Sequence, residues 1–533
     1  MMRRTLLSVF LLFVATIAPA QIQTPVPYTL TFVPVIAPTL PAMHSYCIAN
    51  VSPTQWFILG GRIMGLHTFN PAGNNFAGPN TGLYSFNPAA ATASKLADLS
   101  KLTPTFAGPL TATNQQCEYH PETGMWYIIG GYGLDPVTNT FITFPTIIQI
   151  SVPSLVAIAR NLNFSPAQKQ AAVAALIANP ANIATNPILK VTGGSLSHTA
   201  TGLEFLSFGQ LFDGKYNPFQ SGGFTQVYTQ AVTAFTLNSS PFGVTPVQTY
   251  TSPDPSAPFN RRDFSAVYDV DPTTSQERFS IFGGVFPPGK IAAYDYPVYI
   301  SGSGFGISIN PAPTVHQRFG AYEQPVIVVW DGSKVYHTFF GGIGHFFLNQ
   351  TANQAIVYKE VTTEGRNDGL PFVEDIATQI EDSTGSYTEW VSTQPILGGL
   401  LRGASVDFEP NLALASRFQG TGGTVLKLQS FQPDEQQTIG YIFGGIQADF
   451  PLPCIPSHGT KAASTLYKVV LTYTPWSGLV PSSQATEAVN FSDHSKPGIN
   501  LTGNRLKATG PDPCSSVVKS YAPLVQKKKT VKK

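Results

Sequence analysis

The stretch Trp56-Phe57-Ile58-Leu59-Gly60-Gly61 decides the fold of this chain, because variants of WFILGG recur five more times. In every copy a run of large apolar or aromatic residues ends in glycine. The other copies are WYIIGG (126–131), FLSFGQ (205–210), FSIFGG (279–284), HTFFGG (337–342) and GYIFGG (440–445). The first glycines are 70, 79, 74, 58 and 103 residues apart, so a constant motif alternates with variable connections. A repeat of this kind predicts a repeat architecture.

Each copy of the motif is flanked by further strand-like segments. In the first unit, HSYCIAN (44–50) precedes the glycine strand and the alternating GLYSFNP (82–88) follows it. Turn sequences such as Pro121 to Gly124 favour a hairpin between the first two strands. With a weaker outer strand, each unit predicts a four-stranded antiparallel sheet, and six such sheets arranged radially form an all-β, six-bladed β-propeller. The alternative is a β-sandwich in which these strand ends are unrelated.

The motif also resembles a known family. A hydrophobic strand that ends in double glycine, followed at a distance by a tyrosine-bearing strand, is similar to the kelch repeat over roughly residues 40–476. The third copy departs from the pattern with Gly209-Gln210. The resemblance implies that the last blade is completed from the other end of the chain. We expect YTLTFVPVI (28–36) to pair there with LYKVVLTY (466–473).

The remaining segments suggest export and a short tail. Arg3, Arg4, the apolar run 6–17 and Ala18-Pro19-Ala20 predict a signal peptide over residues 1–20 with cleavage near Ala20. We therefore expect a secreted or periplasmic protein without a membrane span. The propeller would occupy residues 21–480, and residues 481–533 would form a C-terminal extension ending in QKKKTVKK.

One helix is expected to interrupt the β pattern. Ser165 as N-cap and Pro166 at the first helical position predict a helix near residues 165–178. We expect it outside the second or third blade.

The charge balance excludes some classes of partner. Charged residues make up 11% of the chain and the formal net charge is +1. Such a chain lacks the basic surface that nucleic-acid binding requires, so no nucleic-acid partner is expected.

The four cysteines are interpreted as two pairs. Cys47 and Cys117 each lie 13 residues before the first glycine of their unit, so they occupy equivalent positions in adjacent blades. We expect their Cα atoms to lie farther apart than the limit of about 7 Å for a disulfide, which leaves two buried thiols. Cys454 and Cys514 are predicted to form a disulfide that pins the C-terminal segment, which export would permit.

The kelch resemblance also implies a ligand-binding face. Arginines near the start of the innermost strand occur in three units, in Arg262-Asp263-Phe264-Ser265, Arg318-Phe319-Gly320 and Arg402-Gly403-Ala404-Ser405. The resemblance implies that these guanidinium groups face a central pocket, where they can hold carboxylates or sulfates. The alternative is that each arginine bonds to neighbours between blades.

Aromatic and histidine side chains follow the glycine strands on the same expected face. Tyr216, Phe286 and His345 are candidates for contact with a glycan or protein ligand. The alternative is that each of them covers its own blade.

No catalytic constellation is visible. The nine histidines are scattered without metal-ligand spacing, so we predict no metal site and no cofactor, and the catalytic residues, if the protein is an enzyme, stay unassigned. His44 and His198 are interpreted as similar positions in their blades that approach the channel. The copper site of galactose oxidase, which resembles kelch proteins, cannot be assigned either. The expected function is an exported module that binds a protein or glycan. The alternative is a carbohydrate-active enzyme, such as a sugar-acid epimerase or mutarotase with an arginine-lined pocket.

Overall fold

The computed structural model describes residues 26–36, 39–66, 78–216, 223–288, 292–302, 306–344, 346–349, 354–357, 370, 372–392, 400–449, 460–474 and 486–488. Within these ranges the chain is mostly β and is built around four-stranded antiparallel sheets. None of the helices in this part of the chain has the length and apolar character needed to cross a membrane.

The first three sheets follow one another along the sequence, each with its strands in chain order from the inside outward. Sheet 1 contains β2 (Cys47–Ser52), β3 (Gln55–Leu59), β4 (Gly82–Asn87) and β5 (Thr92–Asp98). Sheet 2 contains β6 (Gln116–His120), β7 (Met125–Ile129), β10 (Thr146–Ser151) and β11 (Ile183–Thr185). Sheet 3 contains β12 (Ser195–His198), β13 (Leu203–Ser207), β16 (Ala231–Ser239) and β17 (Phe242–Thr251).

The last three sheets follow this plan, except that sheet 5 has three additional strands and sheet 6 takes its outer strand, β1, from the start of the chain. Sheet 4 contains β18 (Ser265–Asp271), β19 (Gln276–Phe282), β20 (Val298–Ser301) and β21 (Ser308–Pro311). Sheet 5 contains β22 (Val326–Trp330), β23 (Lys334–Ile343), β26 (Phe372–Asp382) and β27 (Tyr387–Ser392), with β36 (Thr486–Ala488) outside and β31 (Val425–Lys427) and β30 (Phe418–Gln419) inside. Sheet 6 contains β29 (Phe408–Pro410), β32 (Gln436–Phe443), β35 (Thr465–Tyr473) and β1 (Tyr28–Ile36).

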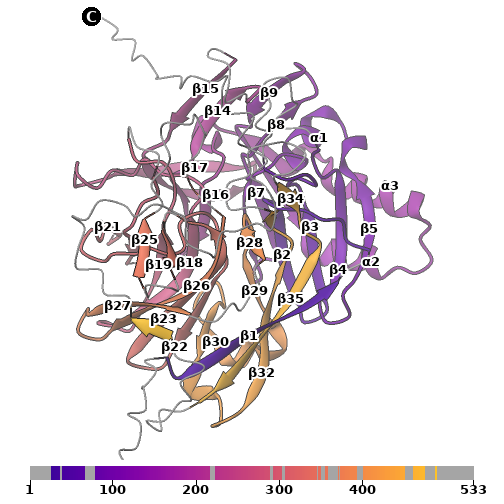
Figure 1. Ribbon diagram of the computed structural model, residues 1–533. Coiled ribbons are helices and arrows are strands. Elements are labelled where there is room, and N and C mark those ends of the chain that lie inside the picture. Colours follow the sequence, from indigo (N-terminus) through magenta and orange to yellow (C-terminus); the bar gives the residue numbers. More distant parts are fainter. Residues whose placement is uncertain are drawn as a thin grey trace, which may run out of the picture.

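Strand β1 completes sheet 6, as the sequence predicts. It pairs antiparallel with β35 from Tyr28 opposite Tyr473 to Ile36 opposite Thr465. In Figure 1 the indigo β1 lies alongside the orange and yellow β32 and β35. The pairing covers the outer edge of β35, which would otherwise expose unpaired backbone groups.

Six apolar clusters fill the spaces between successive sheets. Consecutive residues of a strand point to opposite faces of its sheet, so each glycine strand, and β22 in sheet 5, contributes to both neighbouring clusters. The clusters unite Phe57 with Ile128, Tyr127 with Leu206, Phe205 with Ile281, Phe282 with Val328, Val329 with Ile442, and Phe443 with Ile58. Every sheet therefore packs between two others, in the manner of propeller blades, whereas two facing sheets of a sandwich would each bury one face.

The double glycines join neighbouring sheets. In each motif the second glycine, or Gly209 in the third motif, has positive φ, which glycine adopts without steric cost. Its N–H donates to a carbonyl in the segment that leads into the next sheet. The described bonds run from Gly61 to Ala112, Gly131 to Val191, Gly209 to Arg261, Gly284 to Ala321 and Gly445 to Met43, at 2.7–3.0 Å.

The third motif is displaced by one residue relative to the sequence alignment. Phe208, with φ of 54°, takes the position of the first glycine, and Gly209, with φ of 80°, takes that of the second. Phe208 is fully buried and its ring packs against Phe259 and Phe264, with centroids 4.9 and 5.6 Å away. Aromatic packing thus holds a non-glycine residue in the left-handed region.

A second set of bonds passes through one residue just before each of β2, β6, β12, β18, β22 and β29. These residues are Ser45, Asn114, Gly193, Asp263, Glu323 and Ser405, and all six have positive φ. Each N–H donates to the carbonyl of the preceding member, at 2.6–3.2 Å, and the N–H of Ser45 donates to Ser405. The six bonds form a continuous ring, which we call the hub ring.

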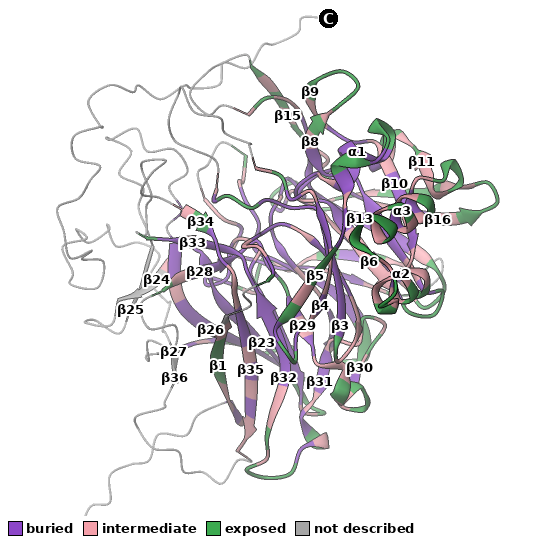
Figure 2. Cartoon of the chain, turned by 90° about the vertical axis from the view of Figure 1, so that its right-hand side faces the viewer, coloured by how far each residue is buried: buried purple, intermediate pink, exposed green. Residues whose placement is uncertain are grey.

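The predicted helix is present as α3 (Pro166–Ile177). Ser165 and Gln168 form a capping box at its start. The helix lies in the connection between β10 and β11, after α2 (Val152–Arg160), and its Gln170 bonds to the backbone of Asp98 in sheet 1. It therefore covers the outer edges of sheets 1 and 2 rather than sheet 3. Figure 2 shows exposed residues along α2 and α3 and buried ones along the strands behind them.

Shorter elements occupy the connections. The remaining helices are α1 (Pro104–Leu110), η1 (Leu99–Lys101), η2 (Pro180–Asn182), η3 (Pro187–Leu189), η5 (Leu412–Arg417) and η6 (Leu428–Ser430). The remaining strands are β8 (Tyr132–Asp135), β9 (Thr140–Thr143), β14 (Gln210–Gly214), β15 (Phe224–Tyr228), β24 (Phe346–Asn349), β25 (Gln354–Val357), β28 (Leu401–Ala404), β33 (Ile446–Ala448) and β34 (Thr460–Ala462).

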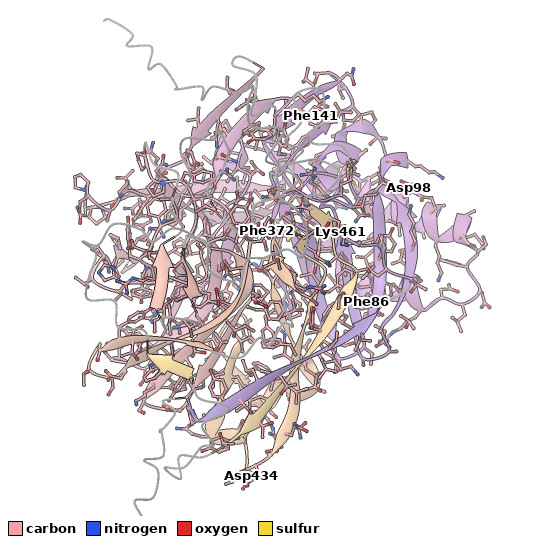
Figure 3. All side chains as sticks on the ribbon, in the orientation of Figure 1. Phe86, Asp98, Phe141, Phe372, Asp434 and Lys461 are labelled. Atoms are coloured by element: carbon pink, nitrogen blue, oxygen red, sulfur yellow. A yellow bond between two sulfur atoms is a disulfide. The ribbon has the colours of Figure 1, made fainter. Side chains whose placement is uncertain are left out.

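The molecule has two opposite faces across the sheets. The glycine face carries the hub ring and the connections after the glycine motifs, including hairpins β8–β9 and β14–β15. The turn face carries the tight turns between the innermost and second strands. In Figure 3, Phe141 of β9 lies at the upper end, and Asp434, in the turn before β32, lies at the lower end.

The prediction for Cys47 and Cys117 is wrong. The two residues form a disulfide between β2 and β6, with Cα atoms 5.8 Å apart. Innermost strands of adjacent sheets converge toward the hub ring, so equivalent positions come closer than we expected. Cys454 and Cys514 lie outside the described residues.

Candidate functional site

Arg262 lies on the glycine face beside the hub ring. It immediately precedes the ring residue Asp263, whose carboxylate pairs with its guanidinium group. The guanidinium carbon is 5.4 Å from the centre of the Phe286 ring. The Nε of Arg262 has no hydrogen-bond partner among the described residues. Arg262 and Phe286, both predicted site residues, are thus in contact.

Tyrosine side chains act electrostatically on the same guanidinium. Burial acts to lower the pKa of Arg262, but the phenol groups of Tyr228 and Tyr322 outweigh it and raise that pKa. Tyr216 acts in the same direction, so a third predicted residue belongs to this group. Phe212 and Phe224 pack against Tyr216 at tilted angles, with ring centroids 5.4 and 5.2 Å away.

The other two predicted arginines occupy different environments. Arg402, in β28, donates to the Tyr467 hydroxyl at 2.7 Å and to Gln447 Oε1 at 3.0 Å. Its guanidinium is therefore engaged within sheet 6 and its neighbouring strand. The backbone N–H of Arg318 donates to the Glu389 carboxylate at 3.1 Å, and its guanidinium lies 6.0 Å from the Phe346 ring.

The three arginines do not occupy equivalent positions. In five of the sheets, the residue directly before the hub-ring member forms a short antiparallel bridge. These equivalent residues are His44, Thr113, Thr192, Arg262 and Tyr322. Arg318 lies four residues before Tyr322, and Arg402 lies three before Ser405. The linkers into the sheets differ in length, so the R-x-G spacing did not identify the register. His345 lies outside the described residues.

A second arginine lies on the glycine face. Arg62 directly follows the first double glycine and bridges to His44. Burial lowers its pKa to about 10, although Tyr322 and Tyr132 act to raise it. Burial and the Arg62 charge together lower the pKa of His44 to about 3, so that imidazole is neutral at pH 7. In the sequence, the position of Arg62 directly after Gly60-Gly61 could have identified it as a residue of the glycine face.

Carboxyl groups with raised pKa values accompany the hub ring. Burial, followed by the nearby charge of Asp407, raises the pKa of Glu323 to about 8. The Asp407 side chain keeps contact with solvent, but the surrounding protein raises its pKa to about 6. Burial and Asp407 also raise the pKa of Glu409 to about 8. This is the usual effect of removing water from a carboxylate and placing another acid beside it.

The turn face holds a separate ionisable group, formed by Glu118, His120 and His198. One ligand atom from each residue lies within 4.8 Å of the other two, so the group is able to hold a metal ion. Glu118 and His120 share one face of β6, and His198 ends β12. The scattered histidines in the sequence gave no such indication.

His44 and His198 are not similar positions, contrary to expectation. His44 lies three residues before β2, on the glycine face. His198 is the last residue of β12, on the turn face.

No protein-family model and no curated protein matches this chain. Solved structures with a similar course include YjhT, at 12% identity and a TM-score of 0.40, covering 85% of this chain and 99% of that one. A fungal alcohol oxidase of the AA5 family in complex with copper matches at 11% identity and a TM-score of 0.32. That match covers 87% of this chain and 99% of the oxidase chain. A GH43_1 enzyme from Xanthomonas citri matches at 10% identity and a TM-score of 0.30. That match covers 67% of this chain and 94% of the enzyme chain. Likenesses this distant say nothing about the activity of this chain.

Proposed function

We propose that the six sheets are the blades of a closed six-bladed β-propeller of the kelch type. Two observations support closure: the bond from Ser45 to Ser405 in the hub ring, and the apolar cluster that sheet 6 shares with sheet 1. The propeller spans residues 21–480 and is followed by an extension over residues 481–533.

The protein binds a carbohydrate that carries a carboxylate or sulfate, at the glycine face around Arg262. One arrangement carries this proposal: the Arg262 guanidinium lies beside the Phe286 ring, Tyr228, Tyr322 and Tyr216 raise its pKa, and its Nε has no hydrogen-bond partner among the described residues. A guanidinium recognises an anionic group through paired hydrogen bonds, and aromatic side chains supply apolar surface and hydroxyls for a sugar ring. Arg318, Arg402 and His345 remain predicted contacts of the same ligand.

A protein ligand on this face is the other form of the binding proposal. A partner could present the same carboxylate through an aspartate or glutamate side chain. The sugar is preferred because the aromatic groups flank the guanidinium.

A carbohydrate-active enzyme, such as a sugar-acid epimerase or mutarotase, is the second candidate. The carboxyl groups of Glu323 and Asp407 favour it, since their pKa values of about 8 and about 6 straddle neutral pH. A carboxyl group that holds its proton near pH 7 is suited to general acid catalysis, and a neighbour that has lost its proton can act as a base. Glu323 would then be the proton donor and Asp407 the acceptor.

Export is part of this proposal, with cleavage near Ala20. The Cys47–Cys117 disulfide is consistent with an oxidising compartment. Sequencing the N-terminus of the mature protein from its native host tests this. A mature chain that still begins at Met1 would contradict export through a cleaved signal.

The binding proposal is tested by titrating sugar acids, sulfated sugars and their neutral counterparts by calorimetry. A charge-assisted hydrogen bond contributes about 1.5–3 kcal/mol, so Arg262→Gln should weaken binding of the acidic sugars by roughly 10- to 100-fold. Arg417→Gln is the matched control, because Arg417 forms a partly buried pair with Glu435, at 2.8 Å, that lies away from this face. Equal affinities for wild type and Arg262→Gln would overturn the proposal.

Turnover separates the two candidates. Interconversion of the sugar's anomers and exchange of its α-carbon proton with solvent are both followed by NMR in deuterated water, with each sugar that binds. If the protein is an enzyme, Glu323→Gln should keep affinity and lose the catalysed interconversion or exchange. If wild type binds and accelerates neither reaction, the binding proposal stands and the enzyme proposal fails.

A further inference from the structure

The turn face contains three buried polar atoms that face one another without hydrogen bonds. His120 Nε2 lies 3.7 Å from Glu118 Oε2 and 3.7 Å from Glu204 Oε2. None of the three atoms has a hydrogen-bond partner among the described residues. A separation of 3.7 Å is too long for a hydrogen bond. Buried polar atoms normally have partners, so this arrangement needs an explanation.

The distances suit a small cation between the atoms. Nitrogen and carboxylate oxygen bind divalent transition metals at about 2.0–2.2 Å. Two ligands in a tetrahedral site are then about 3.3–3.6 Å apart, as follows from those bond lengths. A small movement of one side chain would reduce the observed 3.7 Å to this ligand–ligand distance.

The site has more acidic groups than basic ones. Glu118 and Glu204 are nearly buried, Glu122 is more exposed, and among the described residues the ion pairs of these three carboxylates are with His120 and His198. A divalent cation would balance the charge of these carboxylates.

Neighbouring groups already hold the possible ligands in position. His198 Nδ1 is 2.9 Å from Glu118 Oε1, and the Tyr268 hydroxyl donates to the same oxygen at 2.5 Å. Both contacts leave Glu118 Oε2 directed toward His120. Hydrogen bonds of this kind orient the ligands of protein metal sites.

The site connects three sheets and reaches solvent. Its residues come from β6, β12 and β13, and Tyr268 belongs to β18. The half-exposed Glu122 lies 3.4 Å from His120 Nδ1 and 3.9 Å from His198 Nε2. An ion could therefore enter past Glu122 from the turn face.

We propose that Glu118, His120 and His198, with Glu204 beside them, form a binding site for one divalent transition-metal ion of the zinc class. Two imidazoles with carboxylates are typical ligands of such ions, whereas Ca²⁺ and Mg²⁺ prefer oxygen ligands alone. The site lies on the turn face and is independent of the proposed carbohydrate site.

Zinc binding to the full-length protein tests the proposal. The protein is treated with a chelator, titrated with Zn²⁺ by calorimetry, and its metal content is measured by mass spectrometry after dialysis. We expect one tightly bound Zn²⁺ per chain that excess Mg²⁺ or Ca²⁺ does not displace. His120→Gln and Glu204→Gln should each weaken this binding by more than about 100-fold, beyond the 10- to 100-fold cost of losing an outer partner. Tyr268→Phe should fall within that lower range.

The control is His316→Gln. His316 forms an exposed pair with Asp295 at 3.5 Å, so its loss reports binding to an ordinary surface histidine. Circular dichroism checks that each variant is folded. If the wild-type protein binds no Zn²⁺, that result alone overturns the proposal. So does a folded His120→Gln or Tyr268→Phe protein that, like His316→Gln, retains wild-type affinity and stoichiometry.

Discussion

The backbone N–H of Ser45 donates to the carbonyl of Ser405 at 3.0 Å and thereby joins the first and last sheets. A parallel link runs from the Gly445 N–H to the Met43 carbonyl at 3.0 Å. The two bonds connect segments that are about 360 and 400 residues apart in sequence.

Gly445→Ala should destabilise this junction. Gly445 has φ of 86°, and an added Cβ would meet Val406 Cγ1 at 2.9 Å and the Ala404 carbonyl at 3.0 Å. We expect a loss of about 2–4 kcal/mol in the free energy of unfolding, from backbone strain and steric overlap. Gly385→Ala is the control, since its φ is also positive but nothing lies within 4 Å of the new Cβ. Urea unfolding that ranks the two variants equally would contradict the packing argument.

At position 208, glycine should be tolerated better than alanine. Both substitutions remove the buried aromatic ring, at a cost of about 3–5 kcal/mol. Only alanine keeps the left-handed strain of about 1–2 kcal/mol. Phe208→Gly should therefore have the higher unfolding midpoint. Phe259, which is equally buried but has no positive φ, should show the ordinary order with alanine above glycine. The same order at both positions would contradict the assignment of Phe208 to the first-glycine site.

Asp269→Asn should be harmful at neutral pH and less so in acid. Asp269 accepts from Arg278 Nε at 2.9 Å and pairs with His337 at 3.0 Å. Burial opposes ionisation, but the charges of Arg278 and His337 outweigh it and hold the pKa of Asp269 well below its usual range. This stability is present above the unfolded pKa of about 3.9 and is lost as the pH falls through the folded pKa. We expect a deficit of about 3–5 kcal/mol at pH 7 that narrows below about pH 4. Denaturant unfolding from pH 3 to 7 measures it, and a constant deficit would contradict the prediction.

Glu323 should make the protein less stable as the pH rises. Its raised pKa of about 8 means that the folded state keeps a proton that the unfolded state releases near pH 4.5. The free energy of unfolding should therefore fall between about pH 5 and 8, by roughly 1–2 kcal/mol after allowance for partial solvent contact. Glu323→Gln should reduce this slope. Unfolding curves with the same slope for both proteins would rule out the buried proton.

Reduction of the Cys47–Cys117 disulfide should lower stability by about 2–5 kcal/mol, since it closes a loop of 70 residues. The double variant Cys47→Ala/Cys117→Ala should match the reduced wild type. Thermal unfolding with and without reductant checks this. A midpoint that does not respond to reductant would count against the bridge.

Local sequence patterns predicted the parts of the fold that depend on local chemistry. Alternating residues indicated β1 and its partner β35, and the cap at Ser165 located α3. The Cys47–Cys117 bridge could not be predicted, because it depends on how closely two innermost strands approach. The position of Phe208 was missed because glycine identity was used in place of backbone conformation.

The candidate sites depend still more on long-range geometry. Phe286 could be linked to Arg262 only through a general expectation about the glycine face. Glu118 and His120 lie two residues apart, which places them on one side of a strand. Their neighbour His198 comes from another sheet, 78 residues after His120, so no local spacing could connect them.

The hub ring has a uniform direction, with every N–H pointing to the preceding unit, and therefore has no first or last member. The sequential order of the units is then immaterial to the hydrogen bonds that hold the centre together. Pro27 and Thr474 are themselves joined by a backbone bond of 3.0 Å. A circular permutant that connects these two positions with a short linker and opens the chain between two other sheets should keep all six hub-ring bonds.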